Sequence, residues 1–439
     1  MIRKISLLVV VCILSIFMYA QDTVKTYWHN KTLMSIGIQI NGKEEGIWNY
    51  YHKNGTKWTE GVYKAGQKVG LWKVWYDNGR LAQEYYADNG TFKSWYQSGQ
   101  MEGEGEFKNG KRNGAFSFYH PNGKLFKSCS YMNDSVQGVV IEYHDNGQKS
   151  FEGNYDNGAL NGYATWWNKE GVKEMEGNSI QDLQDGVWIF YHADGTVGSK
   201  GAFEQGEQNG EWIYYYENGK VWKKGNYDHG WRTGVWNAWY EGGQKQRSGA
   251  FIDDKENGNW ISFYETGNVK DAGAFDNGKM TGKWEGYYPN GEKKYETYYK
   301  NNERNGKHKY WNDNGKIKTE GNYSLNLRNG SWKEYADNGK LLESGKYVKD
   351  LKQGKWAFYN ERAIKVREQN FVEDAPDGYF VEYYPNGKKH FEGNFTNRTK
   401  QGTWSCWNPE GKLTYSVVFN KGKKEKVMVD TDSKANKPF

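Results

Sequence analysis

This sequence has little proline, little cysteine and few aliphatic residues, and these shortages narrow its class. Only six of 439 residues are proline, so a β-ladder can keep its backbone donors. Of the three cysteines, Cys129 and Cys406 are too far apart in an extended chain to form a disulfide. A mean hydropathy of −1.02 is typical of disorder, but aromatic residues reach 17%. Disordered segments lack aromatics, so an ordered fold is expected.

The long apolar run of the sequence lies at its start. Arg3 and Lys4 precede an apolar stretch over 5–18, and Ala20 places a small residue before Gln21. This pattern predicts a signal peptide over residues 1–20. We therefore expect an exported protein that is periplasmic, envelope-associated or secreted, with no transmembrane span after cleavage. A retained signal anchor is the alternative.

A phrase of 24 residues repeats along the chain. Glycine opens each of sixteen repeats, from Gly46 to Gly402, and only the step from Gly70 to Gly90 is four residues short. Two residues after this glycine stands tryptophan in ten repeats: Trp48, Trp72, Trp188, Trp212, Trp236, Trp260, Trp284, Trp332, Trp356 and Trp404. A fixed period of this length indicates stacked supersecondary units.

Each repeat is predicted to be a β-hairpin. Nine residues after the opening glycine stands a second glycine, often preceded by Asn, as at Gly55, Gly123, Gly219 and Gly291. Asn-Gly between aromatic runs favours a two-residue type I′ turn. A second and longer turn is expected eleven residues later, where Gly, Asn or Asp recurs, and would lead to the next hairpin.

The aromatic positions leave the two faces of the sheet ambiguous. Rings stand at the second and fifth positions after the opening glycine, as in Trp48 and Tyr51, and such positions point to opposite faces of a regular strand. Either a bulge follows the glycine, or both faces carry rings. We favour rings on both faces of a largely single-layer sheet. A sheet that curls over one buried face is the alternative.

These features predict an all-β protein, an elongated array of about sixteen 24-residue antiparallel β-hairpins in a long twisted sheet or solenoid. Residues 21–45 are expected to form a capping partial repeat, residues 46–420 the array, and the basic residues 421–439 a disordered tail.

No catalytic, cofactor or metal site emerges from this pattern, and we expect no enzyme. His120 and His144 share one position in adjacent repeats, about 10 Å apart by strand spacing. One metal ion cannot bridge that distance. The 60 basic and 54 acidic residues are interspersed, which indicates a solvated face and not a nucleic-acid patch.

The repeat phrase resembles the bacterial MORN-repeat variant family. The resemblance is carried by Gly210-Glu211-Trp212, then Tyr215, then Asn218-Gly219-Lys220 and Gly225-Asn226-Tyr227, and it covers about residues 22–420. It implies a β-hairpin array used in protein association and sometimes in membrane apposition. Some bacterial members carry an antitoxin label. The family has no catalytic residues to transfer.

Three functions remain in competition. The leading hypothesis is an exported protein-interaction or structural scaffold of the cell envelope. The second is a glycan-binding or cell-wall-binding module, because exposed stacked rings suit sugar faces. The third is an antitoxin or immunity partner of a toxin. Tryptophans buried between repeats favour the first hypothesis, whereas rings exposed along one face favour the second.

Overall fold

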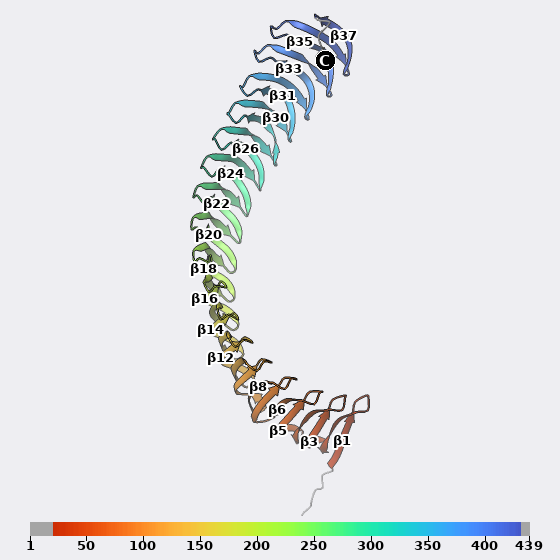
Figure 1. Cartoon of the computed structure of the whole chain (residues 1–439), viewed down its shortest axis with the longest axis vertical. Helices are drawn as coiled ribbons and strands as arrows, with labels where there is room; N and C mark the ends of the chain where they lie inside the picture. The colour runs from red at the N-terminus through yellow and green to blue at the C-terminus, as the bar shows by residue number, and fades with distance from the viewer. Residues whose placement is uncertain (1–20, 432–439) are drawn as a thin grey trace, which may run out of the picture. The chain divides into compact units, whose positions relative to one another are not determined.

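The computed structural model describes residues 21–431 and is built entirely of β-strands. Thirty-seven strands occur in this part of the chain, and no helix is among them. Most consecutive strands pair side by side and antiparallel (Figure 1). The predicted all-β hairpin array is therefore confirmed.

The strands divide between two compact units, where the sequence predicted one uninterrupted array. The first unit extends from residue 21 to Val197 and includes Phe203–Gly206; the second holds Gly198–Ala202 and continues from Glu207. Strands contact only their neighbours in such arrays, so a ladder can divide between any two of them. β17 (Val197–Glu204) contributes residues to both units.

Sixteen strands lie entirely within the first unit. They are β1 (Gln21–Tyr27), β2 (Leu33–Ile40), β3 (Lys43–Tyr51), β4 (Lys57–Lys64), β5 (Gln67–Trp75), β6 (Leu81–Tyr86), β7 (Gly90–Trp95), β8 (Met101–Lys108), β9 (Lys111–Arg112), β10 (Gly114–Tyr119), β11 (Leu125–Met132), β12 (Ser135–Tyr143), β13 (Lys149–Asp156), β14 (Ala159–Trp167), β15 (Lys173–Ile180) and β16 (Leu183–Tyr191).

The second unit contains the remaining strands. They are β18 (Glu207–Tyr215), β19 (Val221–Asp228), β20 (Trp231–Trp239), β21 (Lys245–Ile252), β22 (Lys255–Phe263), β23 (Val269–Asp276), β24 (Lys279–Tyr287), β25 (Lys293–Lys300), β26 (Glu303–Trp311), β27 (Ile317–Ser324), β28 (Leu327–Arg328), β29 (Gly330–Tyr335), β30 (Leu341–Val348), β31 (Leu351–Tyr359), β32 (Lys365–Val372), β33 (Ala375–Tyr383), β34 (Lys389–Thr396), β35 (Thr399–Trp407), β36 (Leu413–Asn420) and β37 (Lys423–Asp430).

The Asn-Gly turn differs from the predicted two-residue type I′ turn. In the first full repeat the backbone amide of Gly55 donates to His52, and the next closing bond joins His52 to Thr56. Gly55 has a φ of 86°, whereas Asn54 is not in the left-handed region. This is a three-residue loop, in which glycine forms a G1 bulge after a type I turn. Asn54 keeps an ordinary φ because its side chain accepts the Thr56 amide.

The two-residue turn is at the other end of the hairpins, where a longer turn was predicted. Between β4 and β5 only Ala65 and Gly66 connect the paired residues Lys64 and Gln67, and both have positive φ, 52° and 81°. These values fit a type I′ turn. This turn type could not be recognised in the sequence, because the first residue of the turn varies between repeats, from alanine to asparagine, leucine and glutamate.

The opening glycine of each repeat lies in a bulge, but the bulge precedes the tryptophan and leaves the second and fifth positions on opposite faces. Where β4 pairs with β5, the register passes from Glu60–Lys73 to Val62–Val69, which leaves extra residues on β5 beside Gly61. All sixteen opening glycines have positive φ, between 62° and 144°. Such a backbone admits glycine at little cost.

Both ends of the described chain are β-strands. Residues 21–45 form the antiparallel pair of β1 and β2 and the start of β3. The prediction of a disordered tail is wrong for residues 421–431, because Lys423–Asp430 pairs with β36 despite its lysines. The predicted signal peptide and residues 432–439 lie outside the described residues.

Candidate functional site

The ten predicted tryptophans are buried and form the core of one face of the sheet, which we call the Trp face. Their exposed fractions lie between 0% and 7%. Each indole packs on a glycine of the preceding hairpin, eleven residues earlier. A Cβ atom built on Gly225, for example, would lie 2.2 Å from the Trp236 ring, and the ten such distances span 2.0–2.3 Å. Only glycine leaves room for the ring, so we call this position the glycine seat.

Two further contacts fix the indoles. Trp236 donates its Nε1 hydrogen to the carbonyl of Asn226 at 3.1 Å, and seven other tryptophans make the same bond. Tyr227 meets the Trp236 ring edge to face, with centroids 5.1 Å apart. Edge-to-face pairs add stability beyond area burial. These contacts hold the indole of one repeat against the preceding repeat.

The glycine seat is a signal that the sequence analysis missed. The irregular residues Val140 and His308 stand where a tryptophan is expected, and their seats hold Cys129 and Thr297 in place of glycine. Phe380 likewise faces Gln369. A tryptophan cannot fit above a side chain, so each repeat with an occupied seat carries a smaller residue. Comparing positions eleven residues apart would have revealed this pairing.

The opposite side, which we call the open face, carries a recurring Lys–Glu–aromatic set. Lys57 pairs with Glu60, and its ammonium lies 5.5 Å from the Trp75 ring of the next repeat. Equivalent sets surround Trp167, Tyr191, Trp311 and Trp407. Glu60 precedes the seat residue Gly61, so the set lies on the side away from Trp72. The favoured prediction of rings on both faces is therefore confirmed.

The chemistry of the open face varies from repeat to repeat. In the first unit, Val139, Tyr163 and Val187 occupy the position after the opening glycine and are 54%, 56% and 62% exposed. In the second unit, Val235 at this position is 57% exposed, whereas Lys283 and Lys355 hold the position in other repeats and pair with Glu285 and Glu368. Exposed apolar residues aligned on one face are typical of interaction surfaces.

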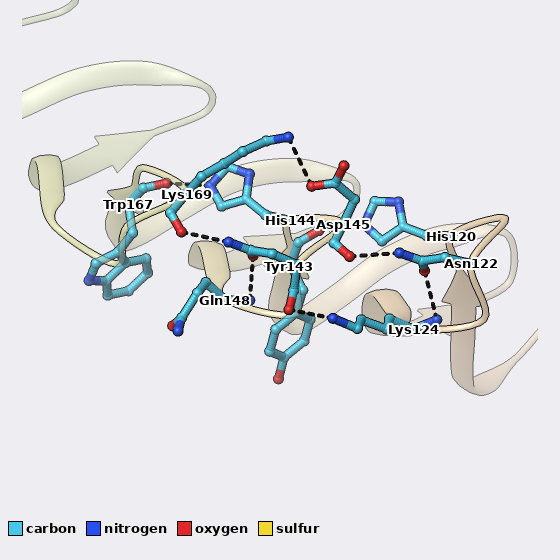
Figure 2. A network of polar contacts seen from close by, with 10 residues as sticks. His120, Asn122, Lys124, Tyr143, His144, Asp145, Gln148, Trp167 and Lys169 are labelled. Carbon is cyan, nitrogen blue, oxygen red and sulfur yellow. Dashed lines mark hydrogen bonds and ion pairs between the residues drawn. The ribbon is translucent and has the colours of Figure 1, made fainter.

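The turns at the Asn-Gly edge are joined by side chains that reach the next repeat. His120 Nε2 contacts the carbonyl of Tyr143 at 2.8 Å, and His144 contacts that of Trp167 at 2.8 Å (Figure 2). Asn122 donates to the Asp145 carbonyl at 2.7 Å and accepts the Lys124 amide. The two histidines therefore link neighbouring repeats. In the described part of the chain no three His, Cys, Asp or Glu side chains gather as a metal site.

His308 is a half-buried histidine that makes stability depend on pH. It stacks on Trp332 at 5.9 Å and contacts Thr297 at 2.7 Å. Burial, with repulsion from Arg304, lowers the pKa of His308 to about 4. Between about pH 6.5 and 4 the unfolded chain therefore binds a proton that the folded chain does not, and stability falls as the pH falls.

We expect the region around β26 to lose about 1–2 kcal/mol from pH 7 to pH 5, allowing for the partial exposure of His308. Hydrogen exchange of the β25–β27 amides, corrected for intrinsic rates, would measure this change. The variant His308→Leu removes the titrating group and should lose this part of the pH dependence. An identical pH dependence in both proteins would contradict the assignment.

Comparison with known families identifies the repeats. The family model described as MORN repeat variant matches nine segments: residues 68–89, 88–109, 112–133, 136–157, 208–229, 280–301, 304–324, 328–349 and 376–397. No curated protein matches the chain. No helix that could cross a lipid bilayer occurs in residues 21–431.

Several solved structures align with the chain at low similarity. A crystal structure of TcdB2-TccC3-Cdc42 is 10% identical, with a TM-score of 0.14, over 90% of this chain and 25% of that one. A pore structure of the Photorhabdus luminescens Tc holotoxin is 12% identical, with a TM-score of 0.15, over 93% and 24%. The chain spans about a quarter of the length of these structures.

Proposed function

Because the chain belongs to the MORN repeat variant family, we propose that it is a non-enzymatic scaffold that binds a protein partner in the cell envelope. The observation that carries this proposal is that the two faces of the sheet have different roles. The tryptophans of the Trp face pack between repeats. The open face is therefore the repeated surface that a partner can contact. Such a surface binds through many similar contacts and needs no single deep site.

The chemistry of the open face favours a protein over a glycan. Sugar rings stack on exposed aromatic faces, but the Trp75 and Trp311 rings are half-buried, and each lies beside a lysine ammonium at 5.5 Å and 5.4 Å. Among the exposed apolar residues of this face, Tyr163 lies beside Glu176, which is paired with Lys173. Apolar positions within a charged surround are typical of protein interfaces.

The place of action is proposed from the sequence. The leader-like segment over residues 1–20 supports export, and the interspersed charges support a partner other than nucleic acid. An exported scaffold would meet its partner in the periplasm, at the envelope or outside the cell. An antitoxin or immunity role is the competing protein-binding function, and the identity of the partner would separate the two.

Capture from the envelope would test the proposal. The mature chain is immobilised and incubated with solubilised envelope proteins and, separately, with purified wall polysaccharide. We expect saturable retention of one or a few proteins. A matched variant, Val139→Glu with Val187→Glu, should weaken this retention and leave the melting behaviour unchanged, because both side chains are more than half exposed. Retention of polysaccharide alone would support the glycan-binding function, and retention of a toxin the antitoxin function.

A further inference from the structure

The tryptophans of the second unit are unevenly covered. In several repeats, the residue two positions after the tryptophan is aromatic and stacks beside the indole. The Trp212 and Tyr214 centroids are 6.0 Å apart at 32°, and those of Trp356 and Phe358 are 6.4 Å apart at 31°. This second ring shields one side of the indole from water.

Three successive repeats lack the shielding ring. They carry Ala238, Ser262 and Gly286 at that position. Their tryptophans, Trp236, Trp260 and Trp284, are 6%, 5% and 7% exposed. Trp332 and Trp404 also lack a ring at that position but are 4% and 2% exposed, so the three successive tryptophans are the most exposed of the ten. The ring of Tyr295 covers Gly286, but the other two positions stay open.

The uncovered positions form a groove on the Trp face. A cavity of about 400 Å³ surrounds Ser262, with Arg247, Trp260, Asp271 and Tyr295 in its walls. A smaller cavity of about 100 Å³ surrounds Ala238 and shares Arg247 and Trp260 with the first. We call these two cavities the Trp-face groove. All of its residues belong to the second unit.

Charged side chains alternate with the small residues across the groove. In the register of neighbouring strands, Lys223 lies opposite Ala238, Arg247 lies opposite Ser262, and Asp271 lies on the other side of Ser262. The Arg247 guanidinium lies 4.2 Å from the Trp260 ring. Asp271 accepts hydrogen bonds from Tyr295 at 2.7 Å and from Ser262 at 3.4 Å.

One cation of the groove lacks a carboxylate. Arg232 pairs with Asp254 at 2.7 Å, and Arg247 pairs with Glu256 at 3.3 Å. Among the described residues no carboxylate is bound to Lys223, whose ammonium lies 4.4 Å from the Tyr214 ring. Burial, with repulsion from Arg232, lowers the pKa of Lys223. An acidic group entering beside Lys223 would relieve this imbalance.

We propose that the Trp-face groove binds a Phe or Tyr side chain of a protein partner, with an acidic residue next to it. The ring enters beside Ser262 and stacks on the partly uncovered Trp260, as Phe358 stacks on Trp356 within the chain itself. The adjacent carboxylate lies between Lys223 and Arg247. The inference rests on the proposed function only in taking the partner to be a protein.

Filling the groove from within tests this proposal. The full-length mature chain is titrated with the capped peptide acetyl-Glu-(4-fluoro-Phe)-Glu-Gly-amide, followed by ¹⁹F NMR. We expect saturable binding by the unmodified chain. The variant Ser262→Phe supplies the shielding ring that other repeats already have, so it should fold normally and bind at least about tenfold more weakly. The control Ser331→Phe makes the same change at an exposed site on the open face and should bind normally.

Two further arms separate the ring from the charge. Acetyl-Glu-Ala-Glu-Gly-amide should not compete, and Lys223→Gln should weaken the acidic peptide several-fold but leave a Gln-flanked peptide unaffected. Undetectable binding, competition by the alanine peptide, or equal binding by Ser262→Phe would overturn the inference. If Ser262→Phe still captures the envelope partner but not the peptide, the groove proposal fails and the proposed function remains.

Discussion

Replacing Gly225 with alanine is expected to destabilise the β19–β21 region by about 3–5 kcal/mol, the cost of displacing a large buried ring. The new methyl group would lie 2.2 Å from the Trp236 ring, so the indole must leave its seat. The φ of Gly225 is not in the left-handed region, so the loss would come from the clash and not from backbone strain. Local opening free energies from hydrogen exchange would measure it, because a repeat array need not unfold in one step.

A matched pair of changes separates the seat from other effects. The exposed neighbour Asn226 contributes only its carbonyl to Trp236, so Asn226→Ala should change stability by less than about 0.5 kcal/mol. The double variant Gly225→Cys with Trp236→Val copies the natural pair Cys129 and Val140 and should be more stable than the sum of the single variants implies. A coupling energy of about 0.5–3 kcal/mol is expected. Strict additivity would refute the glycine seat.

Removing the ring itself is the second large effect. Trp236→Ala should cost about 3–5 kcal/mol in the same strands, because it opens a cavity and also removes the bond to Asn226. Trp231 lies in the same strand, β20, but is 57% exposed, against 6% for Trp236. Trp231→Ala should therefore cost less than about 1 kcal/mol. Equal losses for the two tryptophans would mean that position in the repeat does not decide burial.

Much of this architecture could be predicted from the period alone. The spacing of Gly46, Trp48 and Gly55 repeats along the chain, and such a pattern indicates hairpins whatever the intervening residues. The turn types could not be assigned this way. Asn54-Gly55 suits a type I′ turn and a G1-bulge loop equally well at the sequence level, and only φ distinguishes them.

The Trp-face groove forms where three successive repeats lack an aromatic ring two positions after the tryptophan. Ala238, Ser262 and Gly286 look like ordinary variation until Tyr214 and Phe358 are seen to cover neighbouring tryptophans.

The C-terminal strand is another feature that could not be predicted from the sequence pattern. Lys423–Asp430 has lost the aromatic period, yet β36 offers it an unpaired edge, and backbone pairing alone makes it a strand.

The central claim is that the partner binds a surface repeated along the chain. The most direct test is the affinity of the captured envelope protein for variants that lack four, eight or twelve whole repeats, deleted in frame. The proposed scaffold predicts a graded loss of affinity as repeats are removed, because many equivalent contacts contribute. A complete loss on deleting a single repeat, such as the one beginning at Gly354, with no further change on longer deletions, would contradict it.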